Sequence, residues 1–134
     1  MARVFLIDTN IAIHLRDNLP SVLSKARGHA GGLAMSALTL AELQQGLYSS
    51  PSMWAYRKPR LDMILMSIPV LPFDEAAAAH YGVILGQVGW SRSRAFDRMI
   101  AAHAIATNRV LVTANVSDFD DIPGLQIEDW TEAS

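Results

Sequence analysis

The sequence contains no cysteine, and only 7% of its 134 residues are aromatic. The absence of cysteine excludes disulfides, thiolate metal sites and thiol nucleophiles, and it is compatible with a reducing compartment. No apolar run approaches the roughly 18 residues of a membrane span. Met1-Ala2-Arg3 leads directly into an apolar segment and leaves no room for a signal peptide. We therefore expect a cytoplasmic protein that makes no membrane contact.

Several motifs that mark particular chemistries are also missing. There is no Gly-x-Ser-x-Gly nucleophile elbow, no phosphate-binding loop and no dinucleotide fingerprint. The four histidines are not spaced as metal ligands. A net charge of -2 argues against a strongly basic surface that would bind nucleic acid as a whole. The sequence therefore gives no support for a serine hydrolase or for a nucleotide-binding enzyme with a glycine-rich phosphate loop.

The length and the hydrophobic content are those of one globular domain spanning residues 1–134. The segment Val4 to Ile7 is apolar without polar alternation, which is typical of a strand buried on both faces in a parallel sheet. Further strands are expected at 33–38, 70–73, 110–113 and 125–127, and helices at 11–15, 20–28, 40–47, 53–68, 75–88 and 96–107. This alternation predicts an α/β/α sandwich, with helices flanking a mainly parallel central sheet.

Acidic residues occur where these elements meet. Asp8 follows the first strand, and in open parallel sheets ligands bind beyond the carboxyl ends of the strands. Glu42 stands three residues after Thr39, so the two could form a capping box, although the same place also suits a site at the sheet edge. Asp97 begins a nearly all-apolar helix, where burial would desolvate its carboxylate.

A fourth group of polar residues follows the strand at 110–113. Thr113 and Asn115 share a face by the period of two, and Asp118 follows in a loop. Asp120 and Asp121 remain alternatives to Asp118 as the fourth acid. Three or four carboxylates in one pocket would raise one another's pKa values or require a cation, and oxygen-only ligands select Mg²⁺ or Mn²⁺.

The motifs together resemble a known family. They are Asp8-Thr9-Asn10 after an apolar strand, Thr39-x-x-Glu42, Phe96-Asp97-x-Met99-Ile100-Ala101-Ala102-His103, and Thr113-x-Asn115-x-x-Asp118. In this order and at these separations they resemble the PIN domain of VapC-type toxin ribonucleases over essentially the whole chain.

The resemblance implies a metal-dependent endoribonuclease, which is usually encoded with a small VapB-type antitoxin. It implies that Asp8, Glu42 and Asp97 bind Mg²⁺, with Mn²⁺ as a substitute, and that Asp118 is the more variable fourth acid. Thr9, Asn10, Thr113 and Asn115 would be polar residues lining the site. Metal-activated water as the nucleophile would leave 5′-phosphate and 3′-hydroxyl ends, because the 2′-hydroxyl is not used.

Basic and apolar residues suggest how RNA and a second chain would bind. Arg92, Arg94 and Arg98 surround Asp97 in the sequence, so we expect them to contact RNA. Relatives often have glycine and proline where this chain has Ser91 to Ala95, which puts substrate preference in question. Residues 53–68 carry more apolar side chains than one buried stripe needs, and this excess, with the resemblance, predicts a homodimer.

Two other classes of function are compatible with parts of the pattern. A haloacid-dehalogenase-like phosphatase also has an aspartate at the end of the first strand, but it needs a second aspartate where this chain has Asn10. A non-catalytic binding module of PIN-like fold could use the acids as caps and ion pairs. Stabilisation by Mg²⁺ or Mn²⁺ would separate a metal enzyme from such a module.

Overall fold

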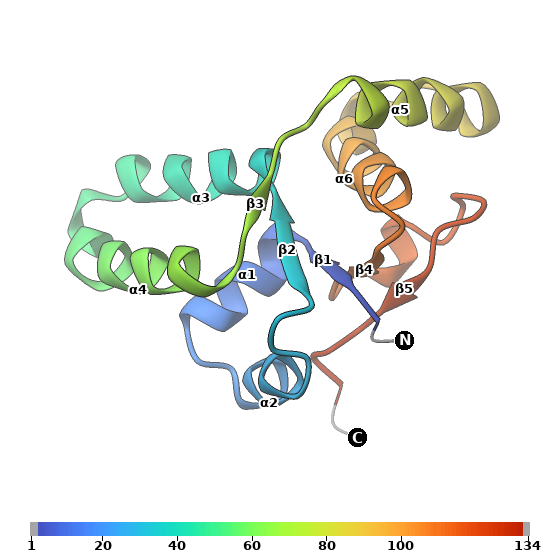
Figure 1. Cartoon of the computed structure of the whole chain (residues 1–134). Coiled ribbons are helices and arrows are strands. Elements are labelled where there is room, and N and C mark those ends of the chain that lie inside the picture. Colours follow the sequence, from blue (N-terminus) through green and yellow to red (C-terminus); the bar gives the residue numbers. More distant parts are fainter. Residues whose placement is uncertain (1–2, 133–134) are drawn as a thin grey trace.

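The computed structural model describes residues 3–132 of the chain. Strands and helices alternate along almost its whole length, as the sequence predicts (Figure 1). In chain order the elements are β1 (Phe5–Ile7), α1 (Thr9–Arg16), α2 (Pro20–Gly28), β2 (Leu33–Ser36), α3 (Ala37–Ser49), η1 (Pro51–Met53), α4 (Trp54–Ser67), β3 (Val70–Leu71), α5 (Glu75–Val88), η2 (Arg92–Arg94), α6 (Ala95–Ala106), β4 (Val110–Val112), η3 (Val116–Asp118) and β5 (Ile127–Glu128).

A single sheet of five strands forms the centre of the described chain, in the order β3-β2-β1-β4-β5. Each of its four strand pairings is parallel, with Phe5 opposite Leu33 of β2 on one side and Val110 of β4 on the other. The chain moves outward from β1 through β2 to β3, and then returns to the other side of β1 with β4. The strand order therefore reverses between β1 and β4, where open α/β sheets bind ligands.

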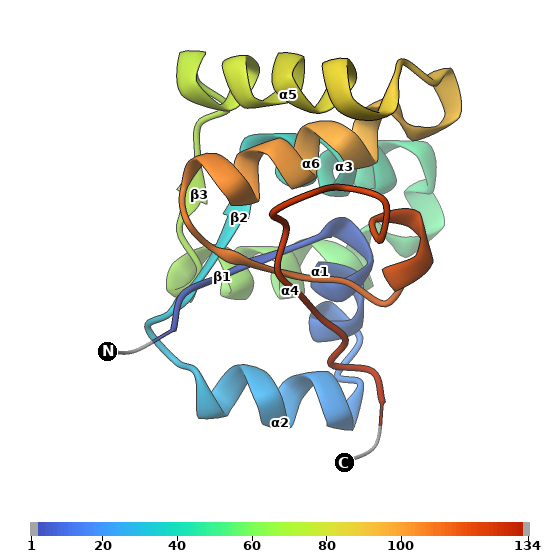
Figure 2. The same cartoon turned by 90° about the vertical axis from the view of Figure 1, so that its right-hand side faces the viewer.

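Helices cover both faces of this sheet, so the predicted α/β/α sandwich is confirmed. Phe5 and Ile7 face a cluster built with α1 to α4, whereas Leu6 faces a second cluster built with α5 and α6. The alternation follows from the strand period of two. Figure 2 shows α5 and α6 above the sheet and α2 below it.

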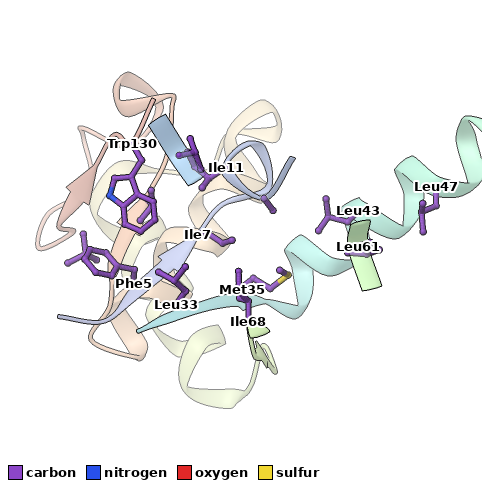
Figure 3. Close-up of a cluster of buried hydrophobic side chains, with 14 residues drawn as sticks. Phe5, Ile7, Ile11, Leu33, Met35, Leu43, Leu47, Leu61, Ile68 and Trp130 are labelled. Carbon is purple, nitrogen blue, oxygen red and sulfur yellow. The ribbon is translucent and has the colours of Figure 1, made fainter. Parts of the chain in front are cut away.

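The first of these clusters extends from Trp130 near the C-terminus to Leu47 in α3 (Figure 3). Trp130 is 1% exposed and packs edge-on against Phe5, with ring centroids 5.2 Å apart. Its indole N–H donates to the Glu128 carboxylate at 3.0 Å. Burying each large apolar side chain stabilises the fold by about 2 kcal/mol, so the C-terminal segment contributes directly to the core.

Side chains at the helix starts explain where α1, α3 and α5 begin. Asp74 accepts from the Ala77 amide at 3.0 Å and caps α5, as predicted. The predicted capping box of Thr39 and Glu42 is wrong, because α3 begins at Ala37 and Ser36 is its N-cap, accepting from the Leu38 amide at 3.1 Å. Thr39 is buried inside the helix. Glu42 consequently lies in the second turn, without a capping role.

The described part of the chain contains no helix with both the length and the apolar character needed to cross a membrane.

Candidate functional site

Asp8 lies at the point where the strand order reverses. Its backbone amide donates to the Val112 carbonyl of β4 at 3.0 Å, so it continues the sheet hydrogen bonding beyond β1. Its carboxylate accepts from the Ile11 amide at 2.9 Å and caps α1. The residue is 7% exposed. Asp8 therefore combines a capping role with a position in the crevice at the carboxyl edge of the sheet.

A cavity of about 480 Å³ opens at this edge, and three acids from separate elements line it. Asp8 comes from the end of β1, Glu42 from α3 and Asp97 from the first turn of α6. The structure thus brings together the three acids that the sequence singled out. Predicted polar residues Thr9, Asn10 and Asn115 also line this cavity.

Hydrogen bonds hold the polar side chains around these acids. The Thr9 hydroxyl donates to the Glu42 carboxylate and lies 3.4 Å from the Thr39 hydroxyl. The backbone N–H of Asn115 donates to the Thr113 hydroxyl oxygen at 3.0 Å. Thr113 is fully buried beside Asp8 and hydrogen-bonds to its carboxylate. Thr9 and Thr113 therefore orient acids of the site.

Burial and mutual repulsion both act on the carboxylates. Burial raises the pKa of Asp8, and the hydrogen bonds from Thr113 and Ile11 partly oppose that rise. Burial, and after it the charges of Asp118, Asp8 and Glu42, together raise the pKa of Asp97 to about 6. A carboxylate repelled by three others is the electrostatic environment in which a cation binds.

The same electrostatics distinguish the three candidates for the fourth acid. Asp118 has the largest charge effect on Asp97, although it does not line the cavity itself. Asp121 instead lies 3.4 Å from the guanidinium of Arg98, and Asp120 is exposed. The geometry thus favours Asp118 over its two neighbours.

The three arginines expected to bind RNA occupy different environments. Arg92 is exposed, and Arg94 is partly buried, donating to the Asp118 carbonyl at 3.4 Å. Arg98 is only 5% exposed, and it donates to the Gly89 carbonyl at 2.5 Å and to Asp121. This placement gives Arg98 a structural contact and does not support its expected role in RNA binding. Arg92 and Arg94 remain the candidates.

The cavity has the donor chemistry of a hard cation site. Carboxylate, hydroxyl and amide oxygens surround it, and Mg²⁺ and Mn²⁺ prefer such ligands. Within residues 3–132, no three His, Cys, Asp or Glu side chains converge closely enough to enclose one ion. The Glu42 carboxylate accepts from the Thr9 hydroxyl, and the Asp8 carboxylate accepts from the Ile11 amide. Both carboxylates would therefore reorient to bind one cation. The crowded charges and oxygen donors fit a divalent cation.

Sequence reasoning missed several residues of the cavity wall. Gln45, Gly46 and Ser49 follow Glu42 at intervals of three, four and seven residues, which places them on the same face of α3. Extending the helical period from Glu42 would have found them. Ser93 and Phe96 line the opposite side, in and after η2.

A second cavity, of about 330 Å³, lies between helices α1, α2 and α4. Apolar residues such as Leu23 and Ile64 line it, and it contains three arginines and no acid. The second cavity therefore lacks the acidic charge pattern of the first.

Comparison with known proteins gives a consistent result along the chain. A family model described as "PIN domain" matches residues 5–125. The tRNA(fMet)-specific endonuclease VapC of Shigella flexneri is 35% identical over 130 residues, which cover 95% of this chain and 98% of that protein. Ribonuclease VapC1 of Haemophilus influenzae strain R2866 is 31% identical and covers 96% and 99% of the two chains.

Solved structures of related proteins also match this chain over nearly its whole length. A chain of VapBC2 from Rickettsia felis bound to a promoter DNA fragment superposes with a TM-score of 0.82, at 31% identity, over 95% of this chain and 98% of that chain. DNA-bound VapBC from Salmonella typhimurium superposes with a TM-score of 0.78, at 31% identity, over 96% and 98%.

Proposed function

The chain belongs to the PIN domain family, and from that premise we propose that it is the endoribonuclease toxin of a toxin–antitoxin pair. The observation that carries this function is the cavity in which Asp8, Glu42 and Asp97 meet at the carboxyl edge of the sheet. Relatives named as VapC ribonucleases cover nearly all of both chains, which supports RNA as the substrate. Neither the phosphatase nor the non-catalytic module is favoured.

The residues that would hold a divalent cation are the four crowded acids. Asp8 and Asp97 would be direct ligands, and Glu42 and Asp118 would bind the cation or orient water. We propose Mg²⁺, with Mn²⁺ as its substitute, because all donors are oxygens. When bound, the cation supplies positive charge to a reacting phosphodiester and lowers the pKa of water.

The chain's own groups contribute the remaining parts of the reaction. The Asp97 carboxylate, with its pKa near 6, is mostly ionised above neutral pH and able to bind a cation. Thr9 and Thr113 hold the carboxylates of Glu42 and Asp8 in place. Arg92 and Arg94 would attract the RNA backbone. Attack by water leaves 5′-phosphate and 3′-hydroxyl ends.

A cognate VapB-type antitoxin is the expected protein partner, since solved relatives are VapBC complexes. An arginine or lysine of the antitoxin would pair with the acids of the site and exclude both cation and RNA. The apolar cavity between α1, α2 and α4 offers a second area of contact. A cytoplasmic location, where RNA and antitoxin are both found, belongs to the same proposal.

Cleavage of a structured RNA with Mg²⁺, Mn²⁺ or EDTA tests this function. We expect cutting with either cation, none with EDTA, and 5′-phosphate ends on the products. Asp97→Asn should lower the cleavage rate by at least 10²-fold, because one ligand charge is lost while the helix start keeps a polar residue.

Asp120→Asn is the matched control, since it removes the same charge from an exposed carboxylate outside the cavity. It should cleave at the rate of the wild-type chain. Unchanged cutting by Asp97→Asn, or 2′,3′-cyclic phosphate ends, would refute the mechanism.

A further inference from the structure

His103 lies in the middle of α6 and is 1% exposed. Its Nδ1 is 2.8 Å from the hydroxyl oxygen of Ser36, which is fully buried at the junction of β2 and α3. The opposite side of the ring hydrogen-bonds to the Pro72 backbone, just after β3, and Phe73 packs edge-on at 5.5 Å. One imidazole of α6 therefore contacts two segments, at residue 36 and at residues 72–73, that are far from it and from each other in the sequence.

The hydrogen-bond partners determine where the imidazole proton resides. The Ser36 hydroxyl oxygen accepts from the Leu38 backbone amide, and its single proton can be donated to Nδ1 of His103. Pro72 has no backbone N–H, so its carbonyl must accept from Nε2–H. Each donor then has one acceptor. This arrangement requires the neutral Nε2–H tautomer.

Burial favours the same neutral form. It lowers the pKa of His103, as does the charge of Arg109, whereas Asp74 and the Pro72 backbone oppose that decrease. A second ring proton would have to point at Ser36, whose hydroxyl proton would then lose its acceptor inside the core.

The Ser36 bond joins the two helices that form opposite walls of the acidic cavity. Helix α3, which Ser36 caps, carries Glu42, and helix α6 carries Asp97 six residues before His103. Among the side-chain hydrogen bonds of residues 3–132, this one alone connects α6 to the β2–α3 junction.

We propose that His103 is a positioning residue that sets the distance between Glu42 and Asp97 by bonding α6 to the N-cap of α3. The inference rests on the proposed function and extends it to a residue that touches neither substrate nor cation. Residues that orient metal ligands indirectly typically change metal affinity by about 10- to 100-fold when replaced.

A matched pair of variants tests the hydrogen bond separately from packing. His103→Leu and His103→Asn both replace the ring with a side chain branched at Cγ, but asparagine alone keeps an acceptor near the position of Nδ1. By calorimetry, we expect His103→Leu to weaken Mn²⁺ binding about tenfold and His103→Asn to stay within about threefold of wild type. The RNA cleavage rate at saturating Mn²⁺ should show the same order, with KM for RNA unchanged.

Nitrogen-15 NMR of the wild-type ring provides a second measurement that needs no variant. We expect a neutral Nε2–H tautomer from pH 5 to pH 8, and an Nδ1–H tautomer or a charged ring would overturn the proposal. Equal losses of Mn²⁺ affinity in both variants, or none in His103→Leu, would overturn it while leaving the proposed function intact. A wild-type chain that neither binds Mn²⁺ nor cleaves RNA would overturn both.

Discussion

At the scale of single residues, Asp97 shows how one side chain can be unfavourable for the fold and useful for a site. Its carboxylate is partly buried and repelled by Asp118, Asp8 and Glu42, which together raise its pKa to about 6. Only Arg94 acts in the opposite direction among the causes that shift it. The folded chain thus retains a proton that an unfolded chain would release near pH 3.8.

We predict that the cation-free chain becomes less stable as the pH rises, because Asp97 then loses this proton and becomes charged in a buried site. Between pH 3.8 and 6 the folded state binds more protons than the unfolded state, so the free energy of unfolding falls as the pH rises through this range. The favourable contribution of protonated Asp97 is complete below pH 3.8 and is lost above pH 6. Asp97→Asn should therefore be about 1 kcal/mol more stable than wild type at pH 7.5, with no such gain at pH 4.

Urea unfolding in EDTA at both pH values measures this difference. Asp120→Asn, which changes an exposed acid, should follow the wild-type chain at each pH. A destabilised Asp97→Asn at pH 7.5 would contradict the prediction.

At the scale of elements, Arg98 of α6 and its N-cap residue Arg94 bind neighbouring segments from positions four residues apart. Arg98 joins the Gly89 carbonyl at the end of α5 to Asp121 in the loop after η3. Arg94 donates to the carbonyl of Asp118, the last residue of η3. The pair holds the loop of the fourth acid against the start of α6, near Asp97.

We predict that Arg98→Met destabilises the chain by about 2 kcal/mol, because it leaves the Gly89 carbonyl and Asp121 without their partner. It should leave the affinity for RNA nearly unchanged when measured on folded protein. Arg92→Ala should do the reverse, weakening RNA binding and flattening its salt dependence without loss of stability.

Urea unfolding and filter binding across a salt series separate the two effects. Loss of RNA affinity in folded Arg98→Met would restore the original expectation that this arginine contacts RNA.

At the scale of the whole molecule, apolar side chains gather on the surface of α4 and beside it. Met66 is 86% exposed, Met63 is 69% exposed and Tyr48 is 71% exposed. The Tyr48 and Trp54 rings pack edge-on at 5.2 Å. Large apolar side chains exposed along one helix and its neighbour are typical of protein contact surfaces.

We predict that the chain is a homodimer through this surface and that Met66→Glu dissociates it, because burying an unpaired charge at an interface is unfavourable. Sedimentation at micromolar concentration without antitoxin measures the change. Ser24→Glu, an equal charge on the exposed side of α2, should remain dimeric. A strictly monomeric wild-type chain would argue against the surface.

The sequence by itself determined features that depend on nearby residues. The unbroken apolar run of β1, the Asp74 cap of α5 and the stop at Gly89 were predicted correctly, since strand burial and helix capping are recognisable within a few positions. Asp8 and Asp97 were recognised in the same way, as acids at the end of a strand and in the first turn of a helix, whereas Glu42 was singled out by a helix cap expected at Thr39 that the structure places at Ser36.

Only the tertiary structure decided which side chains meet. The sequence favoured Thr39 as the cap of α3, but Ser36 caps it, and the Ser36 hydroxyl also lies 2.8 Å from Nδ1 of His103, 67 residues away in the sequence. Arg98 resembles an exposed basic residue in the sequence, yet α5 and the loop at Asp121 bury it. Pairing and burial depend on segments that only folding brings together, so local patterns cannot specify them.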